Sequence, residues 1–460
     1  MNILYLNIHD TGRYIGPYGY PVHTPNLGRL ASEGVLFRHA LCAAPTCSPS
    51  RAALLTGQYP HTNGMTGLAH RGHALVDYRR HLARTLASLG YTRVICGLQH
   101  VASDRAVIGY DVDLGDLERI PSAAGAVPAG NDGGEYLRLA ESAAAYLHSF
   151  AEEKPASGEK RRDGNRFYLE VGMPKPHLYS GRPKDERYVR PPHGLPNTSQ
   201  TREHTALFEA GVEAFDHAVG VILEALDSTG LTDNTLVICT TDHGISFPGF
   251  KCTLGDSGLG VFLIMRGPGG FTGGISYDAM VSHLDIYPTI LELLGAEAGH
   301  RLDGVSLVPL VRGENDSLHE ALFAEINYHA AYQPERCVHT SRYKYIRRFD
   351  RSTARILPNC DPSPSKSLLL EHGWAETPVA EERLYDLVFD PGEHRNLSGD
   401  SQYEQVRREL ADKLEKWMRE TDDPLLAGSV PPPPDAVTTD VHELDPDPRW
   451  RWKRIERGDH

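Results

Sequence analysis

The sequence predicts an α/β protein with a large, mainly parallel sheet sandwiched by helices, followed by a small C-terminal α+β domain that contains an antiparallel sheet. Two observations predict the first part: short apolar runs alternate with longer segments of helical period, and polar residues directly follow several of those runs. After about residue 315 the apolar runs lie too close together for crossover helices, which predicts antiparallel strands. The expected domains are a main α/β domain over 1–315, an α+β domain over 316–427 and an extended arm over 428–460.

The individual elements of the main domain follow from apolar period and from cap residues. Strands are expected where an apolar run is too short for a helix, in chain order at 3–8, 91–96, 166–171, 236–239 and 261–265. Helices are expected where apolar residues recur every three or four positions, often with a cap residue before them or a glycine after them, at 25–33, 81–89, 135–150, 203–226 and 285–294. Segments rich in Gly, Pro or charge predict loops at 60–64, 121–134 and 152–165.

The C-terminal part changes character. Three short apolar segments at 321–326, 336–340 and 343–348 predict antiparallel strands, and residues 402–421 predict a final helix. The segment 428–448 contains a run of four prolines and several Asp residues. Such a composition predicts an extended arm that lies on the surface or on a partner subunit, so a homo-oligomer is possible.

Composition excludes some classes of function. Hydrophobic residues make up 40% and charged residues 23% of the 460 residues, which is typical of a soluble globular protein. The net charge of −14 argues against general nucleic-acid binding. No apolar run is long enough to span a membrane, and the start lacks a signal-peptide pattern, so we expect a cytoplasmic protein. The seven cysteines are scattered and predict neither a disulfide framework nor CxxC metal spacing.

A single stretch, Cys47 to Gly57, organises the chain. Cys47 is expected just before a helix, in which Pro49 suits the first turn and Gly57 the end. A helix N-terminus offers free N–H groups and a partial positive charge, which favour an anion beside the cysteine. Arg51, one turn further, adds a cation with a fork of donors.

Paired ionisable residues follow two of the predicted strands. His9 and Asp10 come directly after the first strand, and Asp242 and His243 follow the strand at 236–239. Ligands of open α/β sheets bind at the carboxyl ends of the strands. The two pairs offer two carboxylates and up to two imidazoles, so they predict a site for a divalent cation.

The stretch from Cys47 to Gly57 resembles the signature C-x-P-S-R-x-x-L-L-T-G of the type I sulfatases and matches it at every fixed position. The resemblance implies the fold of the alkaline-phosphatase superfamily, sulfuric ester or sulfamate hydrolysis, and oxidation of Cys47 to formylglycine by a formylglycine-generating enzyme. Further matches to the family, at 304–310 and 384–397, extend the resemblance over most of the chain. Within the family the sulfamidases are the most similar, which suggests a sulfated sugar as the substrate. The segments that carry this closer likeness are 47–57, 61–68, 244–248 and 417–424.

The resemblance also implies roles for single residues. It places a metal, Ca²⁺ first, on His9, Asp10, Asp242 and His243, in contact with the modified Cys47. Arg51 would stabilise the nucleophile. Lys251 and His100 would hold the sulfate, and His177 would protonate the leaving group.

The sequence departs from the family pattern at three positions. His9 stands where the family has Asp, Leu98 where it has Lys, and Pro174 where it has His. Imidazole ligands suit Mn²⁺ or Zn²⁺ better than Ca²⁺, so these metals are alternatives. Leu98 removes one cation from the expected sulfate pocket.

Two other functions are compatible with these residues. A hydrolase of the same superfamily could act on phosphonate monoesters or phosphodiesters with the same nucleophile. The three departures also allow an inactive protein that binds sulfated glycans, although Cys47, Arg51, Asp242 and Lys251 are all in place.

Overall fold

The computed structural model describes residues 1–115, 134–152, 166–173 and 183–446. Its centre is an eight-stranded sheet with the order β4-β3-β5-β1-β6-β7-β2-β8. The strands are β1 (Asn2–Ile8), β2 (Val35–Leu41), β3 (Tyr91–Gly97), β4 (Val112–Asp113), β5 (Arg166–Met173), β6 (Thr235–Thr241), β7 (Leu263–Arg266) and β8 (Ile275–Ser282). All pairings are parallel except those of β7, which runs antiparallel to both neighbours.

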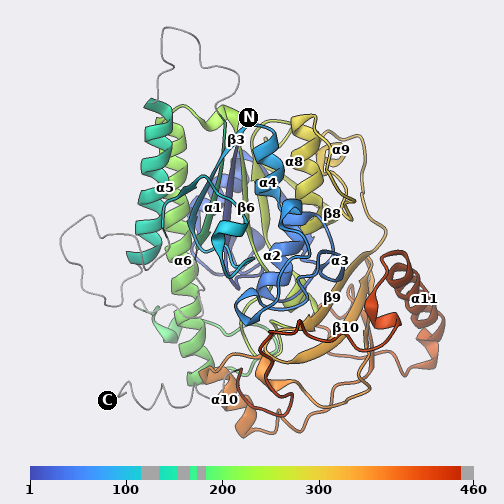
Figure 1. Cartoon of the computed structure of the whole chain (residues 1–460). Helices are drawn as coiled ribbons and strands as arrows, with labels where there is room; N and C mark the ends of the chain where they lie inside the picture. The colour runs from blue at the N-terminus through green and yellow to red at the C-terminus, as the bar shows by residue number, and fades with distance from the viewer. Residues whose placement is uncertain (116–133, 153–165, 174–182, 447–460) are drawn as a thin grey trace.

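Helices cover both faces of this sheet (Figure 1). Side chains of β1 alternate between the two layers: Ile3 and Tyr5 face one core, and Leu4 and Leu6 face the other. The first layer contains α2 (Cys47–Thr56), α4 (Leu82–Ser88) and α8 (Ile286–Leu294). The second contains α1 (Pro25–Glu33), α5 (Gly134–Glu152) and α6 (Ser199–Ser228). The predicted α/β sandwich is thus confirmed.

The C-terminal part forms a separate antiparallel sheet of four strands in the order β12-β11-β10-β9. These are β9 (Leu322–Tyr328), β10 (Tyr332–His339), β11 (Tyr343–Arg348) and β12 (Glu382–Asp386). Helix α11 (Glu404–Glu420) packs Leu414 and Trp417 against the apolar side chains Val338 and Tyr345 of this sheet. Helix α10 (Pro364–Glu371) lies between this part and α6 (Figure 1).

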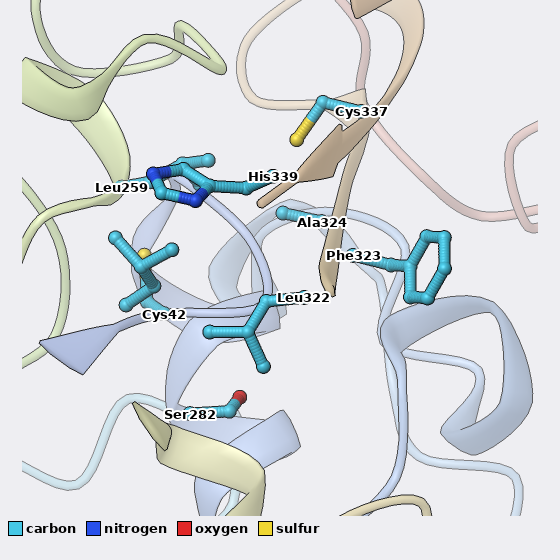
Figure 2. Close-up of a pocket in the computed structure, with 9 residues that line it drawn as sticks. Cys42, Leu259, Ser282, Leu322, Phe323, Ala324, Cys337 and His339 are labelled. Atoms are coloured by element: carbon cyan, nitrogen blue, oxygen red, sulfur yellow. The ribbon is translucent and has the colours of Figure 1, made fainter. Parts of the chain in front are cut away.

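The two sheets meet along a closely packed, largely apolar seam. Cys42, Leu259 and Ser282 of the main domain face residues of β9 and β10, including Ala324 and His339 (Figure 2). The seam joins the two sheets by packing. The exact domain boundaries 315/316 and 427/428 stay predictions.

Several elements differ from the sequence expectations. The strands β2, β8 and β12 are not among those that the sequence predicts, because they carry half-exposed or charged residues and do not show a clear apolar pattern. The loop expected at 60–64 contains a single helical turn, α3 (Pro60–Asn63), which is short enough to be read as a turn. None of the helices in the described ranges has the length and apolar character needed to cross a membrane.

Candidate active site

Strands β1 and β6 bring the two predicted ionisable pairs together. The strands are parallel neighbours with Ile8 opposite Thr241, so the residues that follow them emerge side by side. All four side chains, His9, Asp10, Asp242 and His243, are at most 1% exposed. Asp10 adopts a left-handed φ of 52°, and its backbone N–H donates to Asp242 Oδ1 at 2.8 Å. Because Asp tolerates this conformation, the chain can turn sharply here and keep both carboxylates at the sheet edge.

Helix α2 places Cys47 against these residues. The expectation that Cys47 precedes the helix is wrong by one position, because Thr46 is the N-cap and Cys47 is the first helical residue. All ten residues of α2 are buried, so the helix is an interior element. The Ser50 hydroxyl donates to the backbone carbonyl of Asp242, which ties the first turn of the helix to the end of β6. Gly57 ends the helix with a φ of 64°.

The imidazole of His243 links Cys47 to the carboxylates. Its Nε2 lies 3.1 Å from Asp10 Oδ1 and 3.4 Å from Cys47 Sγ. Its Nδ1 lies 2.9 Å from the backbone oxygen of Gly244, an atom that can only accept. The proton of a neutral His243 therefore belongs on Nδ1, and Nε2 presents its lone pair to the cluster.

This cluster has the composition of a metal site. One ligand atom from each of His9, Asp10, Cys47, Asp242 and His243 can be chosen so that all lie within 4.8 Å of one another. His9 Nε2 is buried, and no described residue forms a hydrogen bond with it. Two carboxylates, two imidazoles and a sulfur atom converging in a buried space fit a divalent cation.

Two buried cations flank the cluster. Arg51 Nε lies 3.3 Å from Asp242 Oδ2, and Lys251 Nζ lies 3.3 Å from Asp10 Oδ1. Burial lowers the pKa of Lys251, but Asp10 and the neighbouring anionic groups outweigh burial and raise this pKa well above its usual value. Lys251 therefore carries a full charge in the site.

The electrostatic field favours an anion at position 47. Burial raises the pKa of the Cys47 thiol, but Lys251, His243 and His9 together hold it well below its ordinary value. The same groups would stabilise any other negative charge that develops on the side chain at this position.

His100 lies at the rim of the cluster, and His177 lies outside the described residues. The His100 ring centroid is 5.3 Å from that of His9, and the His100 backbone adopts a left-handed φ of 57° in the segment after β3. The role expected for His177 stays a prediction.

Two residues near the site were missed from the sequence. His70 Nδ1 lies 3.0 Å from His100 Nε2, and Asp361 Oδ2 lies 3.4 Å from Lys251 Nζ. Asp361 lies in a loop of the C-terminal part, so this part contributes a carboxylate to the neighbourhood of Lys251. No local pattern marks either residue, because each reaches the site only through the packing of distant loops.

A second group of potential metal ligands has another explanation. His61, Glu325 and Asp423 lie close together, but the buried Arg336 pairs with both carboxylates. The Arg336 guanidinium donates to both oxygens of Asp423, at 2.6 and 3.0 Å, and lies 3.8 Å from Glu325. The chain itself supplies the cation here, so this group is a buried ion-pair network.

The fold and site define a protein that can hold an anion and a divalent cation beside a helix-terminal cysteine. A model of the sulfatase family matches residues 1–296, and a model described as N-sulphoglucosamine sulphohydrolase, C-terminal, matches residues 251–376. The chain belongs to the sulfatase family.

Individual relatives agree with this assignment. Human N-sulphoglucosamine sulphohydrolase is 30% identical over 92% of this chain and 91% of its own. An ulvan-active sulfatase of Formosa agariphila is 29% identical over 93% of this chain and 82% of its own. Among solved structures, a 2-O GAG sulfatase superposes with a TM-score of 0.71 at 22% identity, covering 94% of this chain and 95% of that one. The phosphonate monoester hydrolase of Agrobacterium radiobacter reaches 0.68 at 22% identity, covering 93% and 97%. These likenesses confirm the expected alkaline-phosphatase-like fold.

Proposed function

We propose that this chain hydrolyses a sulfate ester or sulfamate on a sulfated sugar, through a formylglycine made from Cys47 and with a divalent metal. The observation that carries the proposal is the position of Cys47: it lies at a buried helix N-terminus, 3.4 Å from His243 Nε2, in a field that favours negative charge. The named relatives that act on N-sulphoglucosamine and ulvan support a sulfated sugar as the substrate class.

The metal ligands and the nucleophile would have separate roles in the reaction. His9, Asp10, Asp242 and His243 would hold the metal, which supplies charge neutralisation at the sulfate oxygens. A formylglycine at position 47 would supply, as its hydrate, two hydroxyls on one carbon. One would attack sulfur while the S–O or S–N bond to the sugar breaks, and deprotonation of the other would then expel sulfate by cleavage of the C–O bond and restore the aldehyde. Donors that hold the sulfate oxygens in the transition state, such as Lys251 and His100, each contribute about 10²–10³ in rate.

The cations orient the anionic group. Lys251 Nζ lies beside Asp10 and can donate to a sulfate oxygen or to the leaving oxygen. Arg51, fixed by Asp242, stabilises a deprotonated oxygen at position 47. His100 binds a sulfate oxygen, and His177 gives a proton to the leaving oxygen or nitrogen.

For the metal we propose Ca²⁺, as the family resemblance implies, and test it against Mn²⁺ and Zn²⁺ because two imidazoles belong to the donor set. Maturation of Cys47 requires a formylglycine-generating enzyme as a partner. A homo-oligomer and a cytoplasmic location stay predictions.

The alternative substrate class is a phosphonate monoester or phosphodiester. The structural similarity to the phosphonate monoester hydrolase of Agrobacterium radiobacter favours this alternative. The experiment that separates the functions measures sulfate release from N-sulfoglucosamine and a set of O-sulfated sugars, and phosphate-ester and phosphonate cleavage in parallel. Sulfate release at least 100-fold faster than phosphonate cleavage supports the proposal. The reverse order identifies a phosphonate hydrolase. Binding of sulfated sugars without turnover of any ester identifies an inactive glycan-binding protein.

A further inference from the structure

The described part of the C-terminal arm, residues 428–446, packs on the main domain of its own chain and binds the Arg71 side chain. The guanidinium of Arg71 donates to the backbone oxygens of Val437 (3.2 Å) and Pro446 (2.7 Å) and to Thr439 Oγ1 (3.2 Å). In return, the Val437 N–H donates to the backbone oxygen of Arg71 at 2.8 Å. A planar guanidinium with several fixed donors suits such a multiple contact. The arm is therefore anchored to the short helix η2 (Ala69–Arg71).

The contact is close enough to require a glycine. Gly72 has a φ of 94°, and a Cβ there would lie 2.9 Å from Cα of Ala436. The residue before Arg71 is His70, whose Nδ1 lies 3.0 Å from Nε2 of His100. The arm thus holds the segment that carries the ring partner of His100.

The same arm holds a second segment near the site. The Lys366 ammonium is 2% exposed and donates to the backbone oxygen of Leu444 in the arm and to that of Cys360 (2.6 Å). Asp361, the next residue, has its Oδ2 3.4 Å from Lys251 Nζ. The arm therefore connects two loops that lie far apart in the sequence, and each loop carries a residue that contacts a candidate catalytic group.

We propose that Arg71 and Lys366 are positioning residues, and that through them the arm fixes the two loops around the sulfate-binding side chains His100 and Lys251. This inference rests on the proposed function. Its physical reason is that Arg71 and Lys366 tie the two loops to backbone oxygens of the arm, and a displacement of about 1 Å at a reacting group can cost about 100-fold in rate. These contacts add to those that Ser48 and Asn359 make at the same loops and restrict such a displacement further.

The test compares three variants in the full-length, metal-loaded protein. Arg71→Ala removes the anchor, Arg71→Lys keeps the charge with fewer fixed donors, and Arg79→Ala is the matched control, an arginine whose side chain is 88% exposed and pairs with Asp77. We measure kcat and KM, amide hydrogen exchange of the arm, and the affinity for inorganic sulfate by calorimetry. Arg71→Ala should lower kcat about tenfold, weaken sulfate binding at least fivefold and speed exchange at Val437 and Thr439. Arg71→Lys should recover part of each loss, and Arg79→Ala should match the wild type.

Thr439→Val is a milder variant for the case that Arg71→Ala fails to fold, because it removes one hydroxyl that accepts from Arg71 and donates to Pro446. Faster exchange in the arm with unchanged kcat and unchanged sulfate affinity would overturn the inference, because the arm would then be released without effect on the site. If the wild type turns over no sulfate ester, the proposed function fails, while sulfate affinity and exchange still decide the role of the arm.

Discussion

Nδ1 of His9 lies 2.7 Å from Oδ2 of Asp242, and both side chains are completely buried. The same carboxylate oxygen lies 3.3 Å from Nε of Arg51. Burial lowers the pKa of His9, but Asp242 outweighs it and the pKa rises to about 9. His9 lies among the five potential ligands of the buried cluster, at a position where the sequence resemblance implies a carboxylate.

Replacing His9 with Asp should change the preferred metal. The variant offers a hard oxygen in place of an imidazole, so it should retain Ca²⁺ over Mn²⁺ and Zn²⁺ about tenfold better than the wild type does. Metal content is measured after dialysis against an equimolar mixture of the three ions. His81→Asn, at a buried histidine that caps α4 away from the cluster, is the control. Identical metal ratios in wild type and His9→Asp would show that His9 is not a ligand.

Cys47 and Cys42 should differ completely in their effect on activity. Both are buried, but only Cys47 belongs to the ligand cluster. Cys47→Ala should reduce sulfate release by at least about 10³-fold, since no side chain remains to attack sulfur. Cys42→Ala should stay within a few fold of the wild type. Equal rates for the two variants would remove Cys47 from the mechanism.

Lys251 should matter more for turnover than for folding of the sheet. Lys251→Met should lower kcat about 10²–10³-fold, because it removes a positioned charge beside the sulfate site. Lys184→Met, which removes a partly exposed cation that pairs with Glu209 on α6, should leave kcat unchanged. Asp361→Asn should act in the same direction as Lys251→Met but more weakly, since Asp10 still holds the ammonium. A kcat of Lys251→Met within threefold of the wild type would contradict the assigned role.

The ion-pair network around Arg336 should give the protein a pH-dependent stability. Burial lowers the pKa of His61, but the carboxylate of Glu325 raises it above its usual value. A raised histidine pKa stabilises the fold fully below about pH 6.5, and this stabilisation is lost as the pH rises through the folded pKa, at about 1.4 kcal/mol per unit of elevation. The Tm difference between wild type and His61→Asn should therefore shrink from pH 6 towards pH 9.

The control for this measurement is His217→Asn, which changes an exposed histidine on α6. It should show no pH-dependent Tm difference from the wild type. If His61→Asn were most destabilising at high pH, the direction assigned to the pKa of His61 would be wrong.

Much of the candidate site could be predicted because its residues follow regular elements. His9 and Asp10 follow β1, Asp242 and His243 follow β6, and parallel strands bring such ends to one edge. The position of Cys47 can also be predicted to within one residue, since Pro49 indicates the first turn of its helix and Gly57 the end. In these cases the local chemistry of the backbone determines where the side chain goes.

The rest depends on contacts between distant segments. Asp361 approaches Lys251 only because the C-terminal part packs on the main domain, and His70 reaches His100 only because the segment 69–71 packs beside the loop after β3. Strand β8 was missed for a related reason: its first half is exposed at the sheet edge and lacks an apolar run. Loop–loop contacts of this kind leave no periodic pattern in the sequence.

The measurement that tests the central claim most directly relates sulfate release to the chemical state of residue 47. The protein is expressed with varied amounts of a formylglycine-generating enzyme, and mass spectrometry gives the fraction of chains that carry the aldehyde. The rate of sulfate release from the best sulfated sugar should rise in proportion to that fraction and extrapolate to zero when Cys47 is unmodified. A rate that does not depend on the aldehyde fraction would contradict the proposal that formylglycine at position 47 is the nucleophile.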